Sequence, residues 1–236
     1  MLRRFKKHVL DRDWFAVGTD VLVVVVGIFI GLQVNNWNEV RKSESETQYY
    51  LGLLIHELEE DVRLNEAEIE AFESSANDLR EAASLLYAKE WSDNDFENFK
   101  KWHVELYHLP MVSRRPVPLR ILMEGGAVNL PSSNELRQHL FRLDNAYGEA
   151  IEFSAKADSL HEVSTLRLIE ALPYGNASDF MAIPVSADYL INNQKLKVAL
   201  RGQSNMHFIQ LGSIKALQAA RRTALAGLKK PVLGAQ

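Results

Sequence analysis

The chain has 236 residues, of which 47% are hydrophobic and 25% are charged, a balance typical of one folded domain with an additional segment. This share of hydrophobic residues excludes a disordered or low-complexity protein. The net charge of −4 argues against a nucleic-acid-binding protein with a globally basic surface. Because cysteine is absent, disulfide scaffolds, thiol nucleophiles and metal sites built on thiolates are excluded as well.

The first expected element is an apolar helix that starts after a basic segment over residues 1–13. The apolar run from Trp14 to Val34 has 21 residues, about 31 Å as a helix, which matches a membrane hydrocarbon core of roughly 30 Å. Trp14 and Trp37 flank it as interfacial anchors. We therefore expect a transmembrane helix over residues 14–37. A buried helix of a soluble protein and a cleaved signal peptide are the alternatives, but the end of the run lacks a small-x-small cleavage pattern.

The distribution of basic residues predicts the orientation of this helix. Five basic residues precede it and two follow it within about fifteen residues; they are Arg3, Arg4, Lys6, Lys7 and Arg12, then Arg41 and Lys42. The positive-inside rule therefore predicts a cytoplasmic N-terminus and an uncleaved signal anchor in the inner membrane. Residues 38–230 are expected to form a periplasmic domain, followed by a C-terminal tail over residues 231–236.

One face of the predicted span has the composition of a helix contact. At 100° per residue, Gly27 and Gly31 each fall within about 20° of Asp20, with Val24 nearby. The two glycines permit close approach of another helix, and a carboxylate at membrane depth normally faces protein or water. We expect this face to bind a second copy or another membrane protein within the lipid bilayer. The alternative is that the glycines are incidental and Asp20 reaches the cytoplasmic interface.

Beyond the span, apolar residues recur at spacings of three and four over more than four heptads. This pattern predicts one long helix from Asn38 to Glu90, about 80 Å in length, with coiled-coil packing. The expected seam consists of Ile55, Leu58, Val62, Asn65, Ile69, Phe72, Ala76, Leu79, Ala83 and Leu86. Asn65 is its polar member, and it either sets the register or oligomeric state or is merely solvated.

Residues 109–133 are expected to be the longest non-helical stretch, because they hold four of the seven prolines and Gly125-Gly126. A short helix, with a capping pattern at Ser92 and Asp95, precedes this stretch. The stretch is a candidate functional loop in which arginines could bind an anion, or could pair with neighbouring carboxylates. These arginines are Arg114, Arg115 and Arg120.

Two further helices complete the expected architecture. One starts at Ser132 or Ser133 and ends before Pro173, and the last runs from about Asn193 to Lys230. No segment shows sustained two-residue alternation, so strands should be few. The predicted fold is all-α, with an N-terminal transmembrane helix that continues into a long-helix antiparallel bundle.

Charge is divided unevenly between the expected helices. Residues 38–100 hold 17 acidic and 6 basic side chains, a net charge of −11, whereas residues 189–236 hold 8 basic and no acidic ones. An acidic first helix packed beside a basic last helix is the simplest explanation. Contact of the basic helix with anionic lipid headgroups, or with nucleic acid if the topology is inverted, is the alternative.

Catalytic and cofactor signatures are absent from the sequence, including nucleotide-binding glycine motifs, the Gly-x-Ser-x-Gly elbow and His-Glu-x-x-His. His56 and Glu60 are one turn apart but belong more simply to a solvated acidic face than to a metal site. His161 and His207 are expected to be hydrogen-bonded core residues. We therefore predict no metal, no cofactor and no catalytic residue.

Two stretches resemble an uncharacterised family of bacterial single-pass membrane proteins, a domain of unknown function. Residues 20–39, DVLVVVVGIFIGLQVNNWNE, resemble its N-terminal signature, an acidic residue before a Val-rich span ending in Leu-Gln-x-Asn-Asn-Trp-Asn-Glu. Residues 122–130, LMEGGAVNL, and 134–137, NELR, are similar to its Gly-centred turn followed by Asn-x-x-Leu-Arg, with departures at Gly125, Pro131 and Ser132. The resemblance implies a membrane anchor and a helical extracytoplasmic domain, and it implies no activity.

The favoured function is therefore a non-enzymatic inner-membrane protein whose periplasmic bundle serves interaction or sensing, and which associates through the Asp20 face. One alternative is a stator-like subunit of an ion-driven complex in which Asp20 carries protons. Another is an enzyme with a site inside a helical bundle, although no Glu-x-x-His pair occurs. No nucleic-acid partner is expected, and the sequence identifies no small-molecule ligand.

Overall fold

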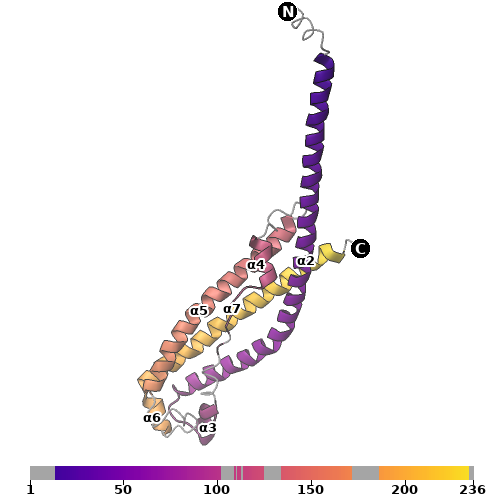
Figure 1. Ribbon diagram of the computed structural model, residues 1–236. Coiled ribbons are helices and arrows are strands. Elements are labelled where there is room, and N and C mark those ends of the chain that lie inside the picture. Colours follow the sequence, from indigo (N-terminus) through magenta and orange to yellow (C-terminus); the bar gives the residue numbers. More distant parts are fainter. Residues whose placement is uncertain are drawn as a thin grey trace, which may run out of the picture. The chain divides into compact units, whose positions relative to one another are not determined.

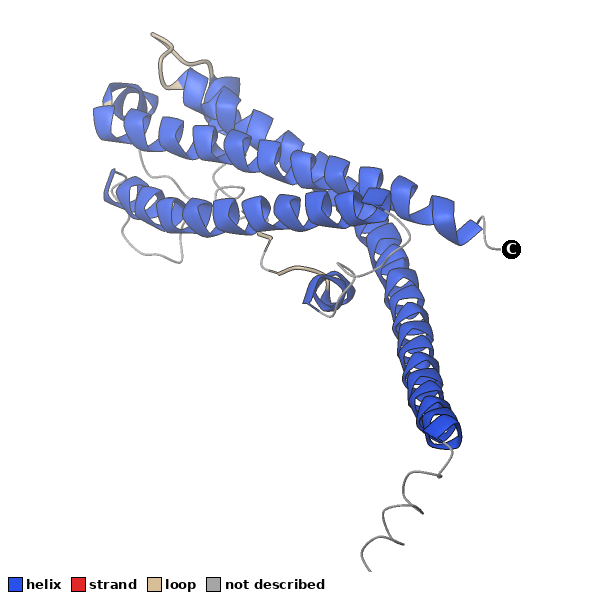
Figure 2. Cartoon of the chain, turned by 90° about the horizontal axis from the view of Figure 1, so that it is seen from above, coloured by secondary structure: helices blue, strands red, loops and turns tan. Residues whose placement is uncertain are grey.

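The computed structural model describes residues 14–101, 109, 111–112, 114–124, 134–171 and 186–233. Every regular element within these ranges is a helix (Figures 1 and 2). The helices are α2 (Trp14–Leu85), α3 (Asp93–Lys101), α4 (Val117–Glu124), α5 (Asn134–Ala171), α6 (Ala187–Asn192) and α7 (Gln194–Leu233). The predicted all-α fold is confirmed.

The chain divides into two compact units, Met1–Tyr49 and Tyr50–Gln236. Helix α2 contributes residues to both units. The second unit begins where α2 enters the hydrophobic core, of which Leu51 is the first member. Residue 38, where the predicted membrane span gives way to charged sequence, lies within the first unit, and the predicted bounds of the span and of the domain after it stay a prediction.

Helices α5 and α7 lie side by side and antiparallel in the second unit (Figure 1). Paired side chains show the direction, because residue numbers rise along one helix as they fall along the other; the pairs are His161 with Gln203, Ser154 with Gln210 and Tyr147 with Arg221. The His139 side chain on α5 packs against Gly227 on α7, where an added Cβ atom would overlap the imidazole ring. This position requires glycine unless the imidazole moves.

The part of α2 after Tyr50 also packs antiparallel to α7, through a ladder of opposite charges. Lys215 contacts Glu73 at 2.7 Å, and Lys229 contacts Glu59 at 2.6 Å. Arg222 and Glu66 form a third pair between them. The predicted juxtaposition of the acidic first helix and the basic last helix is therefore confirmed.

Since α7 is antiparallel to both partners, α2 and α5 run in the same direction. The Tyr147 hydroxyl on α5 donates a hydrogen bond to Asp61 on α2, which places the two helices in contact. Parallel neighbours cannot be joined by a short turn, so the connection from α2 to α5 must return along the bundle. Helices α3 and α4 belong to this connection.

The buried apolar side chains of the described residues form three hydrophobic clusters. The first joins α2, α4, α5 and α7 and includes Leu54, Leu58, Leu119, Leu143 and Leu217. The second joins α2, α3, α5, α6 and α7 and includes Leu79, Leu86, Phe99, Leu190 and Leu200. The third is the smallest and includes Phe72, Ala76, Leu211 and Ile214. Because Leu occupies most of these sites, the heptad pattern of the sequence is sufficient to indicate the bundle.

Helix α4 corrects the prediction that residues 109–133 are non-helical. Pro118 lies in the first turn of α4, where proline loses no intrahelical hydrogen bond, and the Arg120 amide donates to the Pro116 carbonyl. Leu119 and Leu122 then lie on one face and are buried in the first cluster. The prolines start this helix rather than prevent it.

Helix boundaries follow from local capping. Helix α2 ends at Leu85, five residues before the predicted end, where the Trp91 indole donates to the Leu85 carbonyl at 2.7 Å. The predicted capping pattern at α3 is confirmed, because Ser92 and Asp95 exchange hydrogen bonds between amides and side chains. The Ser92 hydroxyl also donates to the Asp95 carboxylate at 2.7 Å, and this bond, together with the one from the Ser92 amide, lowers the pKa of the Asp95 carboxyl.

The chain after α5 differs from the sequence-based expectation in two ways. Helix α6, whose first turn is capped by the Ser186 hydroxyl, was not predicted. Helix α7 extends to Leu233, past the predicted end at Lys230, since a proline in the last turn removes only one backbone hydrogen bond.

Candidate functional site

The apolar part of α2 is long and apolar enough to cross a membrane, and it is the one such helix among the described residues. None of this apolar segment is buried within the structure. Val21, Phe29 and Leu32, for example, are about 60% exposed, which is unusual for large apolar side chains in water. The structure thus contains one long apolar N-terminal helix of the kind found in membrane anchors and signal sequences.

The predicted contact face lies on this exposed helix. A Cβ atom added at Gly27 or Gly31 would meet nothing within 4 Å, so both positions are open to an approaching helix. Asp20 and Val24 are also exposed. Of the two predicted interfacial anchors, Trp14 is the first residue of α2, and Trp37 is exposed with the Arg41 guanidinium over its ring at 5.8 Å.

The second unit contains a cavity of about 240 Å³ bounded by α2, α5, α7 and the segment before α4. Its lining comprises Glu57, Asp61, Asn65, Glu68, Ile69, Phe72, Met111, Val112, Arg114, Arg115, Pro116, Tyr147, Ile214, Leu217 and Arg221. Charged groups and apolar side chains are both well represented. The cavity therefore has the mixed character of a small-molecule site.

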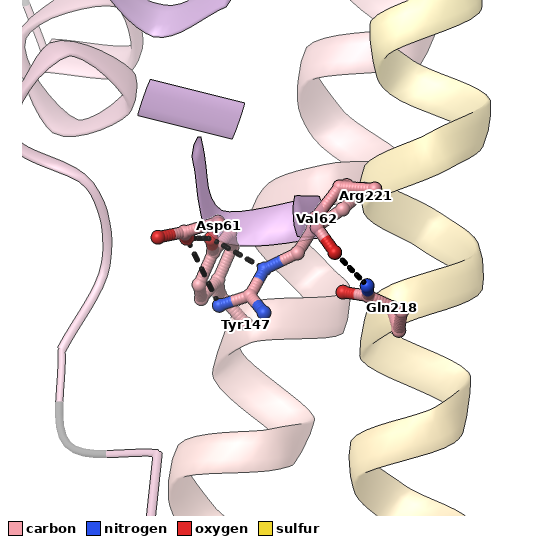
Figure 3. A network of polar contacts seen from close by, with 5 residues as sticks. All are labelled: Asp61, Val62, Tyr147, Gln218 and Arg221. Atoms are coloured by element: carbon pink, nitrogen blue, oxygen red, sulfur yellow. Dashed lines mark hydrogen bonds and ion pairs between the residues drawn. The ribbon is translucent and has the colours of Figure 1, made fainter. Parts of the chain in front are cut away.

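A buried polar network forms one wall of the cavity (Figure 3). Arg221 Nε donates to the Tyr147 hydroxyl at 2.9 Å, and Arg221 Nη2 contacts Asp61 Oδ2 at 3.1 Å. The Tyr147 hydroxyl donates to the same Asp61 oxygen at 3.1 Å. Next to it, Gln218 Nε2 donates to the Val62 carbonyl at 2.9 Å. The network joins α2, α5 and α7 at one level of the bundle.

Burial raises the pKa of the Tyr147 hydroxyl above its ordinary value. The Arg221 guanidinium opposes this shift, and Asp61 adds to it. The phenol therefore stays protonated at neutral pH, which allows it to donate to Asp61 while it accepts from Arg221. In this network Arg221 balances the charge of Asp61, and the Tyr147 hydroxyl donates a hydrogen bond to it.

The segment over the cavity is held to the bundle by a buried serine. The Val112 amide donates to Ser154 Oγ at 3.1 Å, and Gln210 Nε2 on α7 donates to the same oxygen at 3.0 Å. These bonds position Met111 and Val112 against the cavity.

The structure separates the three arginines of the predicted anion site. Arg115 lines the cavity but contacts Asp144 Oδ1 at 2.6 Å, as in the alternative of pairing with a carboxylate. Arg114 is exposed at the cavity, and Arg120 lies exposed on α4 outside the cavity lining. The three therefore do not converge on one anion, because α4 forms where a loop was predicted.

Most residues of the expected coiled-coil seam lie in the core. Leu58, Phe72, Ala76, Leu79, Ala83 and Leu86 are buried, and Ile55, Val62, Asn65 and Ile69 are half-buried. The half-buried members fall mostly where α2 passes the cavity. Asn65 lines the cavity, a location that the heptad pattern does not predict.

His161 and His207 lie in a polar layer of the bundle, with ring centroids 6.1 Å apart. His161 Nδ1 is 3.1 Å from Gln203 Oε1, and His207 Nδ1 is 3.0 Å from the Gln203 carbonyl oxygen. Both are hydrogen-bonded in the bundle, as expected. His56 and Glu60 are exposed on α2. Among the described residues, no group of three or more His, Asp or Glu side chains could hold a metal ion.

The fold and these features define a class of protein: an all-α helical bundle with one apolar N-terminal helix of membrane length. The model of a family described as "Family of unknown function (DUF6090)" matches residues 20–101, about a third of the chain. The match includes the stretch over residues 20–39 and confirms the likeness to a family of unknown function, whereas residues 122–137 lie outside it. No curated protein and no solved structure matches the chain.

Proposed function

We propose that residues 14–37 anchor the protein in a bacterial inner membrane and that the bundle is an extracytoplasmic interaction or sensing domain. The exposed apolar surface of α2 is the observation that carries this proposal. Each Å² of such surface costs about 25 cal/mol in water, a cost that lipid removes. The basic residues before the run support a cytoplasmic N-terminus.

The helical state of the residues after the apolar run favours an uncleaved anchor over a signal peptide. Helix α2 is uninterrupted from Trp14 to Leu85. At the end of the apolar run, the Asn35 side chain donates a hydrogen bond of 2.9 Å to the Glu39 carboxylate, which lies one helical turn further along. The sequence there also lacks the small residues of a cleavage site. The anchor and the first core helix are therefore parts of one element.

Self-association through the Asp20, Gly27 and Gly31 face completes the proposal, because close helix approach in lipid depends on small residues. The native absence of cysteine permits a direct test with single cysteines in membranes. We expect a cysteine at Val24 to form an intermolecular disulfide more readily than one at Phe29, which lies on the opposite side of the helix. Gly31→Leu should abolish the disulfide at Val24.

If cysteines on all sides of the helix formed disulfides equally well, the Asp20, Gly27 and Gly31 face would not be the contact between copies. The absence of disulfides at every position around the helix would remove self-association and leave a different membrane protein as the partner. Gly18→Leu is a control of the same chemistry, since Gly18 also has open space around it but lies off the contact face.

A further inference from the structure

We propose that the cavity between α2, α5, α7 and the segment before α4 binds a small organic cation, an ammonium group attached to an apolar body. The proposal names a ligand for the sensing role of the bundle. The sensing role rests on the proposed function, whereas the binding of the ligand does not. All the lining residues lie in the second unit, so the binding itself does not depend on the membrane anchor.

The carboxylates and the amide that line the cavity lie along one face of α2. Glu57, Asp61, Asn65 and Glu68 follow one another at spacings of four, four and three residues, which places them on one side of the helix. The cavity also has apolar surface against which an alkyl or aromatic group of a ligand can pack. The apolar lining consists of Ile69 and Phe72, which follow the polar residues on α2, and of residues on the other walls, chiefly Met111, Val112, Ile214 and Leu217.

The charge balance of the cavity favours a cation. Asp61 is neutralised by Arg221, and Arg115 is neutralised by Asp144. In the described part of the chain, neither Glu57 nor Glu68 takes part in an ion pair. These two carboxylates face one exposed guanidinium, that of Arg114, so the cavity retains a net charge of about −1.

The environment of Glu57 disfavours the ionised form of its carboxyl. Burial raises the pKa of its carboxyl, and repulsion from Asp61 on the same helix raises it further. Arg114, on the segment over the cavity, only partly opposes these effects. A carboxyl with a raised pKa opposes folding when it is ionised, whereas a bound ammonium would stabilise the ionised form.

An anion fits the same site poorly. It would have to approach the carboxylates of α2. Among the described residues, Arg115 and Arg221 already contact carboxylates, which leaves Arg114 as the lining arginine that could pair with an anion. The volume of about 240 Å³ equals the liquid volume of about eight water molecules, enough for an amine with one aromatic ring.

The test uses the full-length protein in nanodiscs of phosphatidylcholine, with empty nanodiscs subtracted, and calorimetric titration with three probes of matched shape. We expect saturable binding of phenethylammonium and no binding of 3-phenylpropanoate or 2-phenylethanol. Binding should weaken as the pH falls through the raised pKa of Glu57, because protonation removes a carboxylate that faces the ammonium.

Variants locate the site. Loss of charge-assisted contacts in Glu57→Gln/Glu68→Gln should weaken phenethylammonium binding at least about tenfold. Met111→Trp should block the cavity while helicity, measured by circular dichroism, is unchanged. Glu81→Gln, the same change at an exposed α2 position outside the cavity, should have no effect.

The proposal is overturned if phenethylammonium shows no saturable binding, if 3-phenylpropanoate binds as tightly, or if Glu81→Gln weakens binding as much as the cavity variants. Failure of the proposed membrane anchor would be recognised separately, because the protein would then not be recovered in the nanodiscs at all.

Discussion

Replacement of Arg221 by Gln is expected to lower the free energy of unfolding by about 2–3 kcal/mol, whereas Arg222→Gln should lower it by less than about 1 kcal/mol. The two residues are adjacent on α7, and each contacts a carboxylate of α2. The difference lies in burial, since the Arg221 side chain is 10% exposed and that of Arg222 is 58% exposed.

The physical reason is what each substitution leaves behind. Without Arg221, the buried Tyr147 hydroxyl loses a donor, and Asp61, whose side chain is 33% exposed, keeps that hydroxyl as its remaining partner in the network. Without Arg222, Glu66 is simply hydrated. Urea denaturation of the full-length protein in detergent micelles, followed by circular dichroism, measures both values. Equal losses in the two variants would show that the buried network does not hold the three helices together.

A second large effect is expected from charges placed in the apolar segment. The double variant Val24→Arg/Ile28→Arg should be lost from carbonate-washed membranes, because each arginine near the centre of a span costs about 2.5–3.5 kcal/mol on insertion. Val24→Leu/Ile28→Leu, which keeps the segment apolar, should remain in the membrane pellet.

Quantitative immunoblotting of pellet and supernatant measures this partition. Retention of the arginine variant in washed membranes, at the level of the leucine variant, would mean that residues 14–37 do not span the bilayer. The anchoring part of the proposal would then have to be abandoned.

Elements set by local periodicity could be predicted from the sequence. The heptads of α2 and the Ser92–Asp95 cap depend on residues close together in the chain, and the opposite charges of α2 and α7 can be read from the composition of each helix separately. The prediction of a non-helical stretch is wrong at α4, because proline interrupts the interior of a helix but is compatible with its first turn.

The cavity could not be predicted, because its parts come from four separate segments. Asp61, Tyr147 and Arg221 are far apart in sequence, and none of the three forms a recognisable motif. Their meeting depends on α2 and α5 being parallel, which requires knowledge of the long connection between them. The predicted arginine loop includes the segment that forms one wall of the cavity, whereas the carboxylates Glu57, Asp61 and Glu68 line it from α2.

The measurement that tests the account most directly is the accessibility of single cysteines in intact cells. Ser74→Cys on α2 and Asn205→Cys on α7 both replace exposed residues of the bundle, and no native cysteine interferes. Treatment of intact cells with a membrane-impermeant maleimide should label both proteins, and the labelled proteins should sediment with the membranes. Labelling of both only after lysis would place the bundle in the cytoplasm and contradict the proposed topology.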